Sequence, residues 1–373
     1  MKIGWLVGIM CSLVALAPAA HAADQPTTNG IAQIPVTLSV ANTNTSKAPL
    51  ASDGATYTVR GHLTGPASVL RSHQAPEVTV YLFGLDAGEW NWDFKAEPGY
   101  DYAEQMAKAG HVSFTFDEVG YGASGHPVDG NFTSVGAEAD MAHQIIEKLR
   151  SGAYMLAGRP GVSFSRVLLA GHDVGGLVAE VEAYSYADID GLIEVTWADQ
   201  GQTQYIVQRS VTASAEWCTA SPAQAQAGQP TGYVLFATEQ DWHSWMFYDA
   251  DPKVVQATDA LRNPDPCGII RTLAATVLWN NPYAAKSGIP GGDPGNSPVS
   301  LLAQITVPVL IVFGNNDTQL WSRQGENEQQ ANFSGSRDKT TMYVPNSAHF
   351  PMFERSAPQF RQIVASWLTA HGA

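Results

Sequence analysis

A short glycine-rich segment in the middle of the sequence places one acidic side chain at a sharp turn. Residues 166–170 form a strand candidate, and residues 171–176 (Gly-His-Asp-Val-Gly-Gly) follow it directly before a helical pattern. Small residues two positions before and two after Asp173 permit a strained strand-to-helix turn, which pushes the central side chain out above the sheet. A carboxylate in this place is already ionised near neutral pH and can attack without help from a base.

Two later segments supply the partners that such a nucleophile needs. Asp317 follows the apolar run 307–313 after a Gly-Asn-Asn turn, and His349 lies in residues 347–354, just after the last strand candidate. An imidazole oriented by a carboxylate can activate water as a general base. The sequence therefore predicts a catalytic set of Asp173, Asp317 and His349, in the chain order nucleophile, acid, histidine.

These motifs resemble those of the α/β-hydrolase superfamily. Residues 171–176 are similar to the aspartate-nucleophile branch, which contains epoxide hydrolases and haloalkane dehalogenases. Residues 117–125 (Asp-Glu-Val-Gly-Tyr-Gly-Ala-Ser-Gly) look like its D-x-x-G-x-G-x-S segment, in which we interpret Asp117 and Ser124 as turn residues. The resemblance covers about residues 77–370 and implies an α/β-hydrolase fold with this catalytic triad.

The resemblance also implies a reaction in two steps. Asp173 would displace a leaving group at an sp³ carbon, and His349 would then activate water to attack the resulting alkyl ester. The backbone N–H groups of Leu85 and Val174 are expected to hold the oxygen charge that develops. The segment 83–86 (Phe-Gly-Leu-Asp) departs from the His-Gly-x-Pro that is frequent in epoxide hydrolases. Asp86 would add negative charge near the oxyanion site, the wrong sign for catalysis unless it points away or is protonated.

The residues near the nucleophile favour epoxide opening over dehalogenation. Haloalkane dehalogenases typically hold the halide with a tryptophan directly after the nucleophile, and Val174 offers no side-chain donor there. An epoxide oxygen needs a proton source, usually cap tyrosines, and we expect Tyr248 and Tyr283 to serve. Trp242 is a further candidate for contact with substrate, although such a residue more often packs in a core.

Two other functions stay open. The pattern around the turn, residues 167–177, also resembles exported serine esterases and lactonases. In that case Asp173 replaces the usual serine, and the ancestral reaction is acyl transfer. The third hypothesis is a non-catalytic binding module that keeps the fold and the pocket. The complete triad argues against a binding module, whereas Asp86 argues mildly for one.

Strands and helices alternate along most of the chain, which predicts an α/β protein with a doubly wound, mostly parallel sheet. Strand candidates are residues 57–63, 77–83, 111–116, 166–170, 192–197, 307–313 and 340–344. Helical patterns cover residues 102–109, 136–150 and 174–184, with a last helix around residues 360–367. Residues 23–55 are rich in Thr, Asn, Ala and Ser and are expected to pack loosely.

The chain divides into a signal peptide (1–22), a first core part (23–199), a cap insertion (200–300) and a second core part (301–373). Residues 200–300 lack clear strand–helix alternation and are rich in Gln, Pro and Gly, with a cluster of aromatic residues at 242–248. An insertion of this kind between two core strands is expected to cover the active site.

The N-terminus carries the features of an export signal. Met1 and Lys2 precede an apolar run, and Ala-His-Ala at residues 20–22 suits signal peptidase, so we expect a secreted or periplasmic protein. Two cysteines, Cys218 and Cys267, remain after cleavage, and an oxidising compartment favours one disulfide between them.

Composition narrows the partners. The 373 residues include 20 Lys and Arg against 35 Asp and Glu, a formal net charge of −15. Nucleic acid and anionic lipid both require a basic surface, so a small-molecule substrate is expected instead. The histidines show no metal-ligand spacing and the cysteines no CxxC pair, so neither a metal nor a cofactor is expected. The oligomeric state is open.

Overall fold

The computed structural model describes residues 30–48, 50–156, 159–218, 230–280 and 301–371. The signal-peptide prediction and Tyr283 lie outside these residues. The strands are β1 (Ile31–Ala41), β2 (Thr56–Pro66), β3 (Gln74–Leu82), β4 (Ser113–Asp117), β5 (Met155–Leu156), β6 (Arg159–Pro160), β7 (Ser163–His172), β8 (Gly191–Val195), β9 (Tyr233–Val234), β10 (Asp265–Pro266), β11 (Val309–Gly314) and β12 (Lys339–Val344). The helices are α1 (Ala67–Leu70), α2 (Tyr102–Lys108), α3 (Val135–Ser151), α4 (Val174–Tyr186), α5 (Gln204–Thr212), α6 (Glu239–Met246), α7 (Pro252–Asp259), α8 (Cys267–Asn280), α9 (Arg323–Asn332) and α10 (Ala357–His371).

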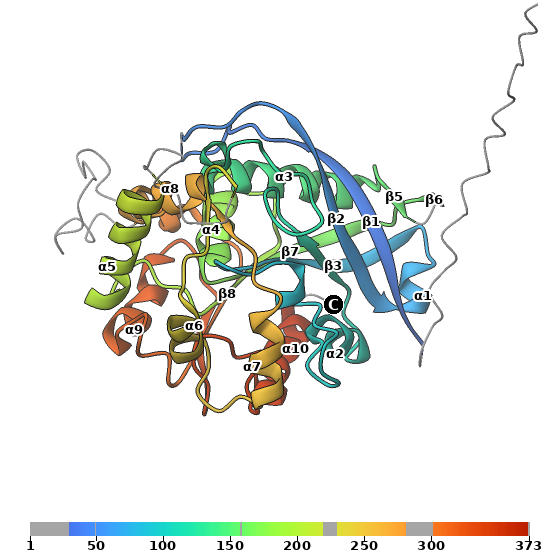
Figure 1. Cartoon of the computed structure of the whole chain (residues 1–373). Helices are drawn as coiled ribbons and strands as arrows, with labels where there is room; N and C mark the ends of the chain where they lie inside the picture. Colours follow the sequence, from blue (N-terminus) through green and yellow to red (C-terminus); the bar gives the residue numbers. More distant parts are fainter. Residues whose placement is uncertain (1–29, 49, 157–158, 219–229, 281–300, 372–373) are drawn as a thin grey trace, which may run out of the picture.

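Ten strands form one mixed sheet in the order β12-β11-β8-β7-β3-β4-β2-β1-β5-β6. The strands from β12 to β4 run parallel, and β2, β1, β5 and β6 continue the sheet antiparallel. Figure 1 shows α3 and α4 on one side of the sheet and α2 with α10 on the other. This is the predicted doubly wound architecture, in which the carboxyl ends of the parallel strands meet at one edge.

The parallel strands are the elements that the sequence predicts best. Every residue of β8 and of β11 is buried, because helices cover both faces of this part of the sheet. Such strands are recognisable as short, nearly continuous apolar runs. All seven strand candidates correspond to observed strands, with bounds that differ by a few residues.

One expectation about the polar regions is wrong, and one helix was not predicted. Residues 31–41, expected to pack loosely, form β1, which pairs with β2 along its full length and buries every second side chain. Its apolar residues alternate with Gln, Thr and Ser, which is the pattern of a strand with one face toward solvent, but the polar composition of residues 23–55 outweighed this pattern in the expectation. The helix α9 was not predicted, because most of its side chains are polar.

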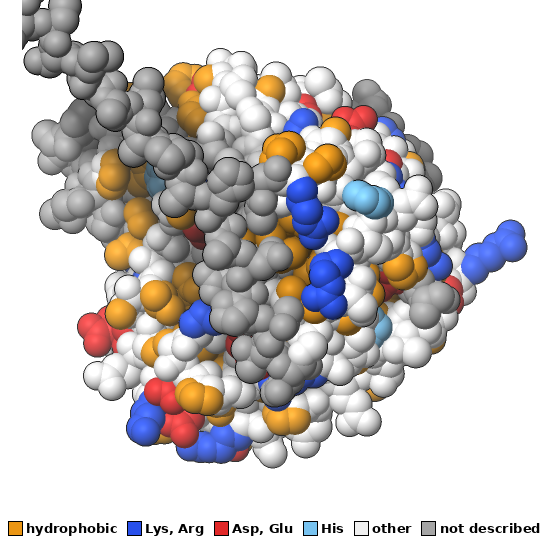
Figure 2. Space-filling model, turned by 90° about the vertical axis from the view of Figure 1, so that its right-hand side faces the viewer, with side chains coloured by type: hydrophobic (Ala, Val, Ile, Leu, Met, Phe, Trp, Pro, Cys, Tyr) orange, Lys and Arg blue, Asp and Glu red, His pale blue; other side chains and the backbone are white. Residues whose placement is uncertain are grey.

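The described residues between β8 and β11 form α5 to α8 and the short β9–β10 pair (Figure 1). We call residues 200–300 the cap segment, and structural statements about it refer to residues 200–218 and 230–280. Among the described residues, no helix is long and apolar enough to cross a membrane. On the face in Figure 2, the basic side chains of the described residues stand singly or in small groups, some of them beside acidic side chains.

Candidate active site

The turn at Asp173 is sharp, and it requires glycine on both sides. β7 ends at His172, α4 begins at Val174, and Asp173 between them has φ 52° and ψ −128°. A Cβ atom at Gly171 would lie 2.1 Å from the carbonyl oxygen of Gly175, and one at Gly175 would lie 2.6 Å from the carbonyl oxygen of Phe83. Positive φ is costly for a residue with a side chain, so the surrounding contacts must hold this conformation.

The three predicted catalytic side chains meet above the carboxyl ends of β7, β11 and β12. His349 Nδ1 lies 2.8 Å from Asp317 Oδ2, and His349 Nε2 lies 3.4 Å from Asp173 Oδ1. Both His349 and Asp317 are almost completely buried, whereas Asp173 lines a cavity. The geometry is that of a base oriented on one side by an acid and facing the nucleophile on the other.

The three side chains shift one another's pKa values, which determines the charges in the site. Burial lowers the pKa of His349, but the carboxylates of Asp317 and Asp173 outweigh that effect and raise it to about 9. Burial raises the pKa of Asp173, but the hydrogen bond and the positive charge of His349 bring it below its usual value. For Asp317, burial dominates and the pKa rises. Near neutral pH, Asp173 is therefore an anion beside an imidazolium.

One expected oxyanion donor already contacts the nucleophile. The N–H of Leu85 donates to Asp173 Oδ2 over 3.1 Å, and this leaves Oδ1 as the oxygen that faces His349. A Cβ atom at Gly84 would lie 2.5 Å from the Cβ atom of Asp173, so the close approach requires glycine there. Val174, the other expected donor, begins α4 beside Asp173 and lines the same cavity.

The cavity above Asp173 has a volume of about 390 Å³ and a mainly apolar wall. Core strand ends and the cap segment both contribute to it. Side chains that line it include Leu85, Trp197, Ile206, Phe236, Trp245 and Trp321. A cavity of this size and composition fits a small apolar molecule.

The expected substrate contacts are not in this cavity. Tyr248 is 59% exposed on the surface, because it follows α6 in a loop whose backbone is held by Glu354. Trp242 is fully buried, donates its indole N–H to Thr258 and packs under the guanidinium of Arg262. Neither residue lines the cavity. The structure therefore does not support their predicted contact with substrate.

The disulfide and the candidate metal ligands lie outside the triad. Cys218 and Cys267 form a disulfide, as predicted. Three groups of described side chains are close enough together to share a metal ion: His62 with Glu89 and Asp93, His143 with Glu182 and Asp188, and Glu239 with His243 and Asp259. None of these groups contains a member of the triad or lines the cavity, so a metal ion at any of them would not take part in chemistry at Asp173.

Solved structures resemble the chain over nearly its whole length. An esterase from Thermogutta terrifontis with bound malate superposes with a TM-score of 0.59 and 16% identity, covering 90% of this chain and 100% of that one. A soluble variant of monoglyceride lipase from Saccharomyces cerevisiae gives 0.57 and 13%, covering 90% and 97%. A putative aryl esterase from Burkholderia cenocepacia gives 0.52 and 18%, covering 86% and 97%. The chain has the α/β-hydrolase fold. No family model matches the sequence, and no curated protein does.

Within this α/β-hydrolase fold, several supporting residues escaped the sequence analysis. The ring of Trp321 stacks on His349 with centroids 5.4 Å apart, and the Nε2–H of His172 donates to the backbone carbonyl of His349 over 2.9 Å. Burial and the charge of His349 lower the pKa of His172 to about 3, so His172 stays neutral. Trp197 lines the cavity with a buried indole N–H that has no hydrogen-bond partner. Only the position of His172 beside Asp173 gave a sequence signal.

Proposed function

We propose that the protein is a hydrolase that uses Asp173 as its nucleophile and opens an epoxide of a small apolar substrate. The observation that carries the proposal is that the two carboxylate oxygens of Asp173 have different partners. Oδ2 accepts the N–H of Leu85, while Oδ1 faces His349 Nε2 beside an apolar cavity. An anion held in this way is suited to attack on a carbon atom rather than to accept a proton.

In the first step, Asp173 Oδ1 forms a bond to an epoxide carbon and the C–O bond of the ring breaks. The electron pair of that bond goes to the epoxide oxygen, which takes up a proton. Formation of the ester removes the negative charge of Asp173, one of the charges that raise the pKa of His349. The pKa of His349 then falls, and the proton that it releases balances the proton gained by the alkoxide.

In the second step, neutral His349 removes a proton from water, and the hydroxide attacks the ester carbonyl carbon of Asp173. Negative charge develops on Oδ2, where the N–H of Leu85 already points. The N–H of Val174, at the start of α4, is the second donor that we propose for this oxygen. Collapse of the tetrahedral intermediate breaks the ester bond, releases a diol and restores the carboxylate.

Dehalogenation is a second candidate, and one feature of the cavity favours it. A halide needs no proton, and no tyrosine is among the described residues that line the cavity. Against it, Val174 offers no side-chain donor for a halide beside the nucleophile.

Ester hydrolysis is the remaining catalytic candidate, because the similar structures include enzymes named as esterases and a lipase. In this case Asp173 stands where those reactions use a serine. Attack of a carboxylate on an acyl carbon gives an anhydride rather than an alkyl ester, so the two classes of reaction differ in their covalent intermediate.

Mass spectrometry after turnover in ¹⁸O-water separates these candidates. We expect label to enter Asp173 with aryl or alkyl epoxides, and the His349→Gln variant to accumulate an alkyl adduct on Asp173. Label in Asp173 with haloalkanes alone would assign dehalogenation. Cleavage of short esters without label in Asp173 would support acyl transfer, and no turnover of any of the three classes would support a binding module.

We also propose that the protein is exported. The charged start, the apolar run and the Ala-His-Ala sequence of residues 1–22 support it, as does a disulfide in the mature part. Expression of the full chain in a bacterial host, followed by N-terminal sequencing of the periplasmic protein, tests this. We expect a start at residue 23; an intact Met1 on protein that stays in the cytoplasm would contradict it.

A further inference from the structure

The loop that carries the Leu85 N–H has an unfavourable backbone conformation. It connects β3 to the short 3₁₀ helix Glu89–Asn91, and Asp86 in its middle has φ 59°. Residues with a side chain adopt this conformation rarely and only where other contacts enforce it. The contacts that hold Asp86 therefore also determine the direction in which the adjacent Leu85 N–H points.

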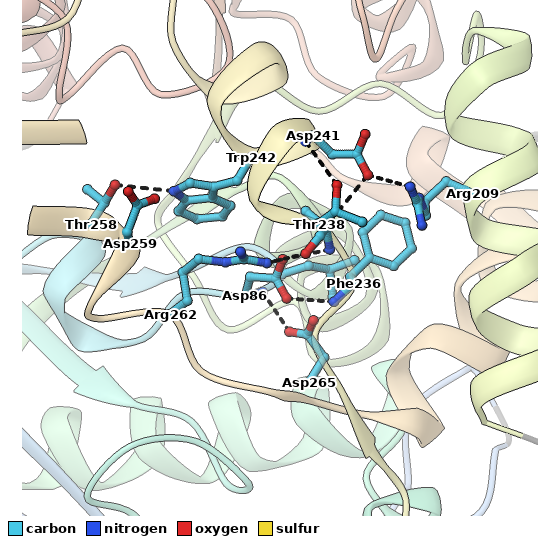
Figure 3. Close-up of polar contacts among 12 residues, drawn as sticks. Asp86, Arg209, Phe236, Thr238, Asp241, Trp242, Thr258, Asp259, Arg262 and Asp265 are labelled. Atoms are coloured by element: carbon cyan, nitrogen blue, oxygen red, sulfur yellow. Dashed lines mark hydrogen bonds and ion pairs between the residues drawn. The ribbon is translucent and has the colours of Figure 1, made fainter. Parts of the chain in front are cut away.

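The side chain of Asp86 is held entirely by the cap segment. Asp86 Oδ1 accepts the N–H of Phe236 over 2.7 Å, and Oδ2 accepts the N–H of Ala237 over 2.8 Å. Arg262 Nη2 makes an ion pair with Oδ2 at 2.8 Å, and the side chains of Arg262 and Asp86 are only 9% and 1% exposed. Figure 3 shows the carboxylate of Asp86 among these donors.

The backbone of Asp86 is bound to the same segment. Its N–H donates to Asp265 Oδ1 over 2.7 Å, and its carbonyl accepts the N–H of Asn263 over 3.0 Å. Asp265 also accepts the hydroxyl of Tyr121 from the core, over 3.1 Å. Both backbone polar groups and both carboxylate oxygens of Asp86 thus contact residues that lie about 150 to 180 positions away in the sequence.

These contacts also show how the negative charge of Asp86 near the oxyanion site is compensated. The carboxylate of Asp86 is paired with Arg262 and with two backbone N–H groups of the cap segment, so its charge is compensated locally. Burial and the neighbouring Asp86 raise the pKa of Asp265 well above its usual value. Asp86 lines the cavity, but its carboxylate is bound by these three donors, which reduces the expected conflict with catalysis.

We propose that Asp86 is a positioning residue that couples docking of the cap segment to the oxyanion site: by binding Phe236, Ala237 and Arg262, it aims the N–H of Leu85 at Asp173. This inference rests on the proposed role of Asp173 as nucleophile. Its consequence is that the catalytic site is complete only when the cap segment is seated on residues 84–88.

The two steps of the proposed reaction respond differently to loss of this coupling. Attack on the substrate removes charge from Asp173, so the Leu85 N–H stabilises the starting carboxylate at least as well as the transition state. Hydrolysis of the ester builds charge on Oδ2 and needs that N–H. A misdirected Leu85 therefore slows ester breakdown, by about 10- to 100-fold if the donor is displaced rather than removed, while ester formation keeps its rate.

Asp86→Asn and Arg262→Gln test the proposal, with Asp241→Asn as the matched control. Asp241 makes an ion pair with Arg209, which Figure 3 shows, and its side chain also bonds Tyr205 and Thr238, which belong to the cap segment too. Rapid-quench mass spectrometry with styrene oxide and with 1-chlorobutane measures formation and breakdown of the Asp173 ester separately. We expect both Asp86→Asn and Arg262→Gln to accumulate ester, and Asp241→Asn to break it down at the wild-type rate.

A second measurement does not depend on turnover. In ¹⁵N-leucine-labelled protein, Asp173→Asn should shift the Leu85 amide resonance, because that N–H donates to Asp173. The shift should be lost or much reduced when Asp173→Asn is made in an Asp86→Asn background, and retained in an Asp241→Asn background.

The outcomes separate the two proposals. Wild-type ester breakdown in Asp86→Asn and Arg262→Gln, or an unchanged Leu85 response, would overturn the positioning role. An equal slowing in Asp241→Asn would also overturn it, because any cap defect would then suffice. If no ester forms in His349→Gln while the Leu85 response behaves as expected, the positioning role stands and the proposed chemistry fails.

Discussion

The core and the cap segment face the same cavity, but different kinds of interaction hold their functional residues. In the core, Asp173, Asp317 and His349 stand on turns directly after parallel strands, so local backbone rules place them at one edge of the sheet. In the cap segment, the residues that matter to the site act through buried polar contacts with a distant loop, chiefly at Asp86.

The core turns thus hold the reacting groups, whereas the cap segment shapes the surroundings of those groups. The turns of the core have glycines that exclude other residues, so a small change there alters the reacting atoms themselves. The cap segment determines the shape of the cavity and the direction of the Leu85 loop, so changes there are expected to alter rates and stability by smaller factors. Variants in the two regions therefore test the comparison.

The largest effect is expected for Asp173→Asn. The amide keeps the size of the side chain and can accept the Leu85 N–H, but it has no anionic oxygen to form the ester. Turnover should fall by about 10⁴-fold or more, as measured by steady-state kinetics on the best substrate of the panel. Asp338→Asn, which removes an exposed core acid, is the control and should keep wild-type activity. Substantial activity in Asp173→Asn would exclude the proposed nucleophile.

Gly84→Ala should be the most harmful change in the core that leaves the triad intact. The new methyl group would meet Asp173 Cβ at 2.5 Å and Oδ2 at 2.7 Å, so either the loop or the nucleophile must move. We expect turnover to drop by about 100-fold, as for other displacements of about 1 Å. Thermal melting distinguishes this from unfolding: a cooperative transition with lost activity agrees with the prediction, and unimpaired turnover contradicts it.

The sequence was informative where function depends on local backbone. The fully buried strands and the glycines of residues 171–176 each produce a pattern within about ten residues, and the structure has both features. Trp321, His172 and Asp86 contribute through partners 28 to 179 positions away, and no pattern in a single sequence encodes such a pairing. The helix α9 was missed because its buried positions are themselves glycine or polar, and β1 because the polar composition of residues 23–55 was given more weight than its alternating apolar residues.

Reduction of the Cys218–Cys267 disulfide should affect the cap segment before the core. The bond joins residues 49 positions apart, and Cys267 follows β10, the strand that contains Asp265. In the chain-entropy treatment, a loop of this length contributes about 3–4 kcal/mol. We expect limited proteolysis of reduced protein to cut within residues 200–300 while the rest stays resistant. The Cys218→Ser/Cys267→Ser variant should be cut there with or without reductant; unchanged resistance of the reduced protein would contradict the prediction.

The smallest effect concerns pH and belongs to the core. Burial raises the pKa of Glu118 and that of Glu194 to about 8, and the neighbouring carboxylates raise that of His349 to about 9 against the effect of burial. In the unfolded chain these groups titrate near 4.5 and 6.5. Between pH 6.5 and 8 the folded protein therefore holds more protons than the unfolded chain at all three, and its free energy of unfolding must fall as pH rises.

His172 does not disturb this window. Its pKa is lowered to about 3 in the folded protein, so below pH 6.5 only the unfolded chain binds a proton there. His172 therefore lowers the free energy of unfolding only as pH falls below 6.5. Thermal unfolding at pH 6.5 and pH 8 measures the difference, and we expect a melting temperature lower by a few degrees at the higher pH. Glu118→Gln keeps an oxygen to accept the N–H of Phe83 and removes one titrating group. The loss of stability between pH 6.5 and pH 8 should therefore be smaller in this variant. If the stability of the wild type stays constant or rises from pH 6.5 to pH 8, the prediction is wrong, because other groups then balance the buried acids of the core.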